Sequence, residues 1–145
     1  MINLLVTGGC GFIGSHTCLS LLERGFNITI IDSNINSSER SLKKIIEIDK
    51  LKNKKFNENL SFIKGDIRDH GLLDSIFMNS IKTKSPIDAV IHFAGLKAVG
   101  ESIKNPLMYW DNNVCGSISL FKVMEKYGCN NIVFSSSATI YGKST

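Results

Sequence analysis

Short apolar runs rich in β-branched residues alternate along the chain with longer stretches in which apolar residues recur every three or four positions. The short runs have the length of buried strands, and the longer stretches have the period of helices that bury one face. This alternation is typical of βαβ units, in which helices connect the strands of a parallel sheet. It predicts strands at residues 2–7, 27–32, 60–64, 89–93 and 131–135. We expect helices to cover each strand on both faces.

Four of the longer stretches are predicted to be helices, at residues 12–24, 41–55, 72–82 and 106–127. Gly25 follows the first helix and offers the left-handed conformation that often ends one. Pro106 suits the first turn of the last and longest helix, and Gly128 suits its C-terminal end.

These elements predict an α/β fold of the Rossmann type, a doubly wound parallel sheet that forms one domain over residues 1–145. Right-handed crossovers, with a change of direction after the third strand, give the strand order 3-2-1-4-5. Ligands of such sheets bind at the carboxyl ends of the strands where the direction changes. We therefore expect the ligand crevice at the ends of the first and fourth strands.

The composition supports one domain and narrows the possible partners. With 145 residues, 43% of them hydrophobic, the chain can build one buried core. Its formal charge is +4, but the lysines are scattered, which favours a solvated basic surface over a nucleic-acid interface. The salt dependence of any DNA binding would test that alternative. Because no apolar run approaches the roughly 18 residues of a membrane span, we expect no membrane partner.

The cysteines and the N-terminal segment favour a cytoplasmic protein. The four cysteines form no Cys-x-x-Cys pair and lie at no zinc-ligand spacing, so we expect a reducing compartment and no metal site. The first predicted strand runs directly into glycines, which we interpret as leaving no room for a signal peptide.

The strongest local motif is the sequence TGGCGFIG at residues 7–14, directly after a predicted strand and before a predicted helix. Gly9, Gly11 and Gly14 fit the Gly-x-Gly-x-x-Gly spacing, and Gly8, Gly11 and Gly14 fit a related one with two residues in each gap. Such glycines allow a tight turn and a close approach of the backbone to a pyrophosphate. The N–H groups at the helix start would bind this anion. The motif predicts a dinucleotide site.

Three further residues lie at strand ends near this motif. Asp32 follows the glycines by about twenty residues, where a carboxylate accepts hydrogen bonds from an adenosine ribose and repels a 2′-phosphate, which favours NAD over NADP. The alternative for Asp32 is a residue that caps a turn. Asp66 is predicted either to accept from an adenine amino group or to cap a helix. His92 is interpreted as a packed core histidine rather than a base.

Four segments together resemble the UDP-glucose 4-epimerases, a family of extended short-chain dehydrogenases. They are TGGCGFIGSH at residues 7–16, FAGLKAVGES at residues 93–102, DNNV at residues 111–114 and FSSSATIYG at residues 134–142. They occur in the order that the family has, and the resemblance extends over essentially the whole chain. The GLKAVGES part is narrower than the glycine motif and favours the 4-epimerases over nucleotide-sugar dehydratases.

The resemblance implies a role for individual residues. A pyrophosphate would contact Gly8, Gly11, Phe12, Ile13 and Gly14; the adenosine ribose Asp32, Asn36 and Ser37; the adenine Asp66 and Ile67; the middle of the cofactor Phe93, Ala94, Gly95, Leu96 and Lys97; and the nicotinamide side Asn112. Ser137 would be the catalytic serine that bonds the reacting sugar hydroxyl, the alternative being simple exposure. The segment at residues 32–37 departs from the family pattern, so the ribose contacts are the least secure of these.

The reaction implied is the interconversion of UDP-galactose and UDP-glucose through a 4-keto sugar on bound NAD, in an enzyme that is a homodimer when complete. The family's proton-transfer pair, Tyr-x-x-x-Lys, is not in this sequence, because Tyr109, Tyr127 and Tyr141 are followed four residues later by Asn113, Asn131 and Thr145. The substrate lobe of the family is also absent, so the fold is incomplete relative to it. We expect the NAD-binding part of a longer enzyme. The alternatives are a truncated, inactive NAD-binding module and another nucleotide-sugar epimerase or dehydratase.

Overall fold

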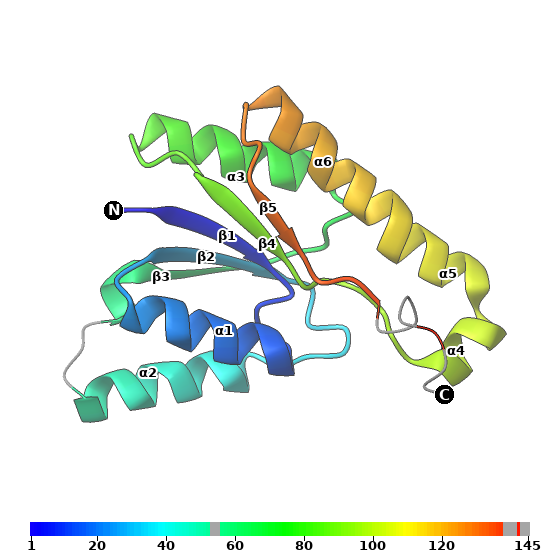
Figure 1. Cartoon of the computed structure of the whole chain (residues 1–145), viewed down its shortest axis with the longest axis horizontal. Coiled ribbons are helices and arrows are strands. Elements are labelled where there is room, and N and C mark those ends of the chain that lie inside the picture. The colour runs from blue at the N-terminus through cyan, green and yellow to red at the C-terminus, as the bar shows by residue number, and fades with distance from the viewer. Residues whose placement is uncertain (53–55, 138–141, 143–145) are drawn as a thin grey trace.

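Five parallel strands form a single sheet in the computed structural model of the chain, which describes residues 1–52, 56–137 and 142. The strands are β1 (Asn3–Thr7), β2 (Asn27–Asp32), β3 (Leu60–Lys64), β4 (Ala89–His92) and β5 (Ile132–Phe134). Their order in the sheet is β3-β2-β1-β4-β5, which confirms the predicted topology (Figure 1). The strands β2 and β3 are added on one side of β1, and β4 and β5 on the other, so the order of strands reverses between β1 and β4. Thr7 of β1 pairs with His92 of β4 at this position.

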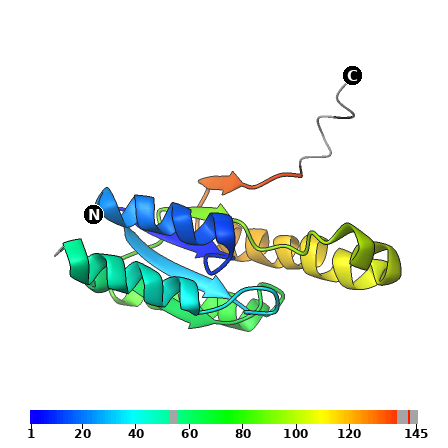
Figure 2. The ribbon, with the colours of Figure 1, turned by 90° about the horizontal axis from the view of Figure 1, so that it is seen from below.

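Helices lie on both faces of the sheet, α1 (Phe12–Glu23) and α2 (Arg40–Lys52) on one, and α3 (His70–Lys82) and α6 (Gly116–Lys126) on the other (Figures 1 and 2). Consecutive residues of β1 pack against helices on opposite faces of the sheet, because side chains alternate along a strand. Leu5 packs in the core with α3 and α6, and Val6 packs in the core with α1 and α2. No helix within residues 1–52 and 56–137 is long and apolar enough to cross a bilayer.

The predicted helices and the observed ones differ mainly in the long C-terminal helix. It consists of α5 (Pro106–Trp110), a π-helical turn η2 (Asp111–Cys115) and α6. The short helix α4 (Val99–Lys104) and the 3₁₀ turn η1 (Phe56–Asn59) were not predicted, since both are too short to produce a clear period. The helix predicted at residues 41–55 is observed as α2, and residues 53–55 lie outside the described part of the chain.

The expectation that helices cover every strand is wrong for β5. Val133 is 62% exposed and Phe134 52% exposed, whereas Val6 on the central strand β1 is fully buried. Of the described residues, those of β1, β2 and β4 enter the two hydrophobic cores, and those of β5 do not.

Candidate functional site

The glycine loop connects β1 to α1 and fits tightly between two neighbouring strands. Gly8 has a φ of +70° and donates its N–H to the carbonyl of Ile31 at 2.9 Å. A Cβ atom on Gly8 would lie 2.6 Å from the backbone nitrogen of Ala94, and one on Gly14 would lie 2.4 Å from the carbonyl oxygen of Gly8. Both distances are shorter than real Cβ contacts. Glycine is therefore required at both positions by space, and at Gly8 also by backbone conformation.

The first turn of α1 offers an anion site above this loop. Gly11 occupies the N-cap position and brings no side chain to the helix start. The first N–H groups of a helix have no partner within the helix, and its dipole favours a negative charge there. The side chains of the next two residues, Phe12 and Ile13, are 79% and 54% exposed. This arrangement fits a pyrophosphate bound by backbone groups, because no side chain caps the N–H groups at the start of α1.

Asp32 connects the glycine loop to the turn that follows β2. Its carboxylate is buried and accepts the backbone N–H groups of Cys10 and Asn34, each at 2.9 Å, and the hydroxyl of Ser37 at 2.6 Å. Burial, aided by the charge of Asp32, raises the pKa of the Cys10 thiol to about 12. Ser37 is thus hydrogen-bonded to Asp32, whereas Asn36 is exposed on the same turn. The Asp32 carboxylate therefore ties the glycine loop to the turn that follows β2.

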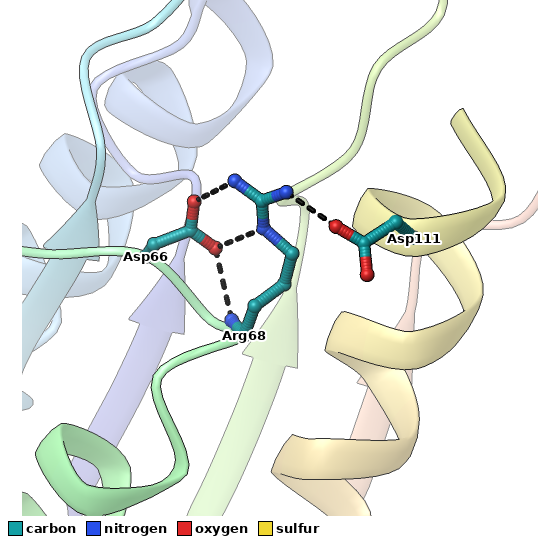
Figure 3. Close-up of polar contacts among 3 residues, drawn as sticks. All are labelled: Asp66, Arg68 and Asp111. Carbon is teal, nitrogen blue, oxygen red and sulfur yellow. Dashed lines mark hydrogen bonds and ion pairs between the residues drawn. The ribbon is translucent and has the colours of Figure 1, made fainter. Parts of the chain in front are cut away.

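Asp66 lies just after β3 and is held by a neighbour in sequence. Its carboxylate accepts the backbone N–H and the guanidinium of Arg68 (Figure 3). The N-cap of α3 is a different residue, Asp69, whose side chain accepts the N–H of Leu72 at 2.9 Å. The alternative interpretation of Asp66 as a helix cap is therefore wrong. Its side chain, 30% exposed, is free of that structural task.

Ile67 packs against the first residue of α6. Its side chain is only 4% exposed, and a Cβ on Gly116, the first residue of α6, would come within 2.8 Å of it. The Asp66 loop and the start of α6 are therefore in direct contact, and a side chain at Gly116 would require the Ile67 side chain to shift.

The segment after β4, residues 93–98, is tied to the α5 and η2 helices by side chains. The amide of Asn113 accepts the N–H of Leu96 and donates to its carbonyl, both at 2.8 Å. The hydroxyl of Tyr109 accepts the N–H of Ala98 at 3.1 Å and lies 2.7 Å from the carboxylate of Glu101. These contacts fix the course of the backbone that was predicted to line the middle of a cofactor.

The remaining residues of that segment differ in their exposure. Phe93 and Ala94 are half-buried, and Gly95 and Lys97 are exposed. Asn113 and Tyr109 were not predicted to be site residues from the sequence. Asn113 adjoins Asn112 in the DNNV segment, but only the phase of the π-helical turn decides which asparagine reaches Leu96.

Asn112 and Ser137 occupy different environments at the end of the sheet that carries β4 and β5. Asn112 is buried on η2, 8% exposed, next to the residue that holds the 93–98 segment. Ser137 is exposed on the segment that follows β5. Asp32 thus contacts both the glycine loop and Ser37 directly, whereas Ser137 lies beyond β5, the edge strand of the sheet.

His92 links β1, β4 and α6 from inside the core. Its Nδ1 lies 2.5 Å from the hydroxyl of Thr7, and its Nε2 lies 2.9 Å from the hydroxyl of Ser117. Ser117 donates to the carbonyl of Asn113, so the protonated ring nitrogen is Nε2, and Nδ1 accepts from Thr7. Burial lowers the pKa of His92 to about 4. The interpretation of His92 as a packed core histidine is confirmed.

Comparisons with known proteins identify related sequences. A family model described as GDP-mannose 4,6 dehydratase matches residues 5–145. The chain is 52% identical over 140 residues to a UDP-glucose 4-epimerase of Cyamopsis tetragonoloba and 48% identical over 139 residues to one of Bacillus subtilis. The matches cover 97% and 96% of this chain but 37% and 38% of those proteins. The chain thus spans less than two fifths of the length of these curated relatives.

Solved structures with the same fold include two that hold ligands. A UDP-glucose 4-epimerase from Stenotrophomonas maltophila, with bound NAD and formylated UDP-arabinopyranose, matches with a TM-score of 0.85 and 42% identity over 99% of this chain and 39% of that one. One from Bifidobacterium longum, in complex with NAD+ and UDP, matches with a TM-score of 0.82 and 41% identity over 97% of this chain and 38% of that one.

Proposed function

Because the chain belongs to the GDP-mannose 4,6 dehydratase family, we propose that it is the NAD-binding portion of a UDP-glucose 4-epimerase. The observation that carries the proposal is the glycine loop, whose backbone is held by Asp32 and which has no room for a side chain at Gly8 or Gly14, so that the chain turns tightly into the start of α1. The identity to UDP-glucose 4-epimerases, about half of all aligned positions, supports the same assignment.

The cofactor would lie across the carboxyl ends of the strands. The pyrophosphate would bind to the first turn of α1, through Gly8, Gly11, Phe12, Ile13 and Gly14. The ribose would bond Asp32, with Asn36 and Ser37 beside it, and the adenine would lie at Asp66 and Ile67. Residues 93–97 would line its middle, and Asn112 would lie on the nicotinamide side. NAD, when bound, accepts a hydride from the sugar and returns it.

The substrate would be a UDP-sugar, UDP-galactose or UDP-glucose, which passes through a 4-keto sugar. Ser137 would hydrogen-bond the hydroxyl at the reacting carbon, because a serine hydroxyl can accept and donate at once. Its exposed position after β5, at the carboxyl end of the sheet, supports this role. We further propose that the complete enzyme is a cytoplasmic homodimer.

A comparison of two cofactors tests the proposal on the purified chain. Titration with NAD and NADP is expected to give tighter binding of NAD, because the Asp32 carboxylate repels a 2′-phosphate. Asp32→Ala is expected to weaken NAD binding by roughly 1 to 3 kcal/mol. Asp88→Ala, at an exposed carboxylate by the amino end of β4, serves as the control and should leave both affinities unchanged. Equal affinities, or a preference for NADP, would show the proposal to be wrong.

Activity separates the NAD-binding portion from a complete enzyme. We expect the 145-residue chain to produce no UDP-glucose from UDP-galactose in the presence of NAD, because it lacks a Tyr-x-x-x-Lys pair to move the proton. Turnover above a control without protein would contradict this expectation.

A further inference from the structure

The guanidinium of Arg68 donates hydrogen bonds to both oxygens of the Asp66 carboxylate (Figure 3). Nε donates to Oδ1 at 3.0 Å, Nη2 donates to Oδ2 at 2.6 Å, and the backbone N–H of Arg68 donates to Oδ1 at 2.9 Å. This is the bidentate arrangement in which arginine fixes the plane of a carboxylate as well as its charge. Without it, only the backbone bond to Oδ1 would limit rotation of the carboxylate.

Arg68 is itself held by the helix on its other side. Its Nη1 donates to Oδ2 of Asp111 at 2.5 Å, on the π-helical turn η2 (Figure 3). Its stem lies along the start of α6, where a Cβ on Gly116 would come within 3.4 Å of Cγ of Arg68. The guanidinium therefore has two fixed neighbours, one carboxylate on the β3 loop and one on the helix.

The bonds from Arg68 leave Asp66 with one free acceptor position. A carboxylate has about four lone-pair positions on its two oxygens. Within the described part of the chain, Oδ1 accepts two hydrogen bonds and Oδ2 accepts one. The side chain is 30% exposed, so the remaining position on Oδ2 is open to a ligand. The same hydrogen bonds from Arg68 lower the pKa of Asp66, so that the group stays ionised and acts only as an acceptor.

We propose that Arg68 is a positioning residue that holds the Asp66 carboxylate in one orientation, with one acceptor position on Oδ2 turned to the ligand. The site thereby binds a purine with a 6-amino group more tightly than one with a 6-oxo group. This proposal rests on the proposed function, which puts the adenine of NAD at Asp66. A 6-amino group donates to the carboxylate, whereas a 6-oxo group presents a second acceptor to it. Discrimination depends on the orientation of the carboxylate, because a freely rotating one can turn away from the 6-oxo group.

The test compares NAD with nicotinamide hypoxanthine dinucleotide, which differs from it only at position 6 of the purine. The dissociation constants of both are measured by calorimetry on the purified chain. We expect the parent to bind NAD at least about 10-fold more tightly. Arg68→Met is expected to reduce this ratio to below about 3-fold, and Arg68→Lys to an intermediate value, because an ammonium cannot make the bidentate contact. Asp111→Asn should lower the ratio less than Arg68→Met does.

Two further variants separate the possible outcomes. Lys126→Met breaks a comparable exposed ion pair, with Asp74 on α3, and should leave the ratio unchanged. Asp66→Asn should abolish discrimination, since its amide can turn a donor towards a 6-oxo group. Because Arg68 and Asp111 are both partly exposed, we expect Arg68→Met to unfold within about 3 °C of the parent.

The results distinguish a failure of the proposed NAD placement from a failure of the proposed role of Arg68. If the parent binds neither dinucleotide, or if Asp66→Asn leaves the ratio unchanged, the proposed placement of NAD is wrong, and the inference falls with it. If Asp66→Asn abolishes discrimination but Arg68→Met keeps the ratio of the parent, the proposed function stands and the role of Arg68 is overturned.

Discussion

The carboxyl ends of β1 and β2 and the edge strand β5 belong to one sheet, yet their side chains differ in burial. Asp32, at the end of β2, is buried, and the chain itself supplies three hydrogen bonds to its carboxylate. On β5, the apolar side chains of Val133 and Phe134 are more than half exposed. A polar group is enclosed at the end of β2, whereas apolar groups are exposed on β5.

This difference separates a preorganised region from one that adds little to stability. A loop whose donors and acceptors bond each other keeps its geometry without a ligand, so less ordering remains to be done when a ligand binds. Exposed apolar side chains contribute little to stability, because folding removes little of their surface from water. The glycine-loop region should therefore be sensitive to small changes, and β5 should be tolerant of them.

The largest effect is expected from Gly8→Ala in the glycine loop. A Cβ there would meet backbone atoms of residues 93 and 94 at 2.6 to 2.8 Å, and the positive φ of +70° adds strain. We expect a loss of about 3 to 5 kcal/mol in the free energy of unfolding. Urea denaturation measures it.

Gly25→Ala is the matched control for that substitution. Gly25 also has a positive φ, +83°, but a Cβ there would meet nothing within 4 Å. It should cost only about 1 to 2 kcal/mol, the contribution of backbone strain alone. If Gly8→Ala and Gly25→Ala cost the same, crowding against β4 does not restrict the loop.

An intermediate effect is expected from the titration of His92, between the two regions. Burial lowers its pKa in the folded state to about 4, from the 6.5 that is usual for histidine. Below pH 6.5 the unfolded chain therefore binds a proton that the folded chain does not, so stability falls as the pH falls from 6.5 towards 4. The loss between pH 7 and pH 5 should be about 2 kcal/mol.

His92→Gln removes this titration and should flatten the pH dependence by that amount, whatever its effect on stability at pH 7. Unfolding free energies in urea at several pH values measure the slopes of the parent and the variant. An unchanged slope in His92→Gln would mean that His92 is protonated in the folded state.

The sequence predicted the order of the strands and the glycine loop because both depend on local signals, namely short apolar runs and glycines at fixed spacing. It did not predict that Asn113 holds Leu96, because this contact depends on a π-helical turn that shifts the phase of the helix. It also did not predict the contact between Arg68 and Asp111, 43 residues apart, which only the packing of the β3 loop on the helix creates. Periodicity alone predicted a covered β5, since a strand of apolar residues has the same pattern at an edge as at the centre.

The smallest effect is expected from Val133→Ala on β5. Val133 is 62% exposed, whereas Val90, on the neighbouring strand β4, is fully buried. Val133→Ala should cost no more than about 0.5 kcal/mol, and Val90→Ala about 2 kcal/mol, because the latter loses buried methyl groups and leaves a cavity. Urea denaturation at two protein concentrations measures both. If Val133→Ala costs as much as Val90→Ala, the apolar face of β5 is covered in solution, and a cost that rises with protein concentration would identify a second copy of the chain as the cover.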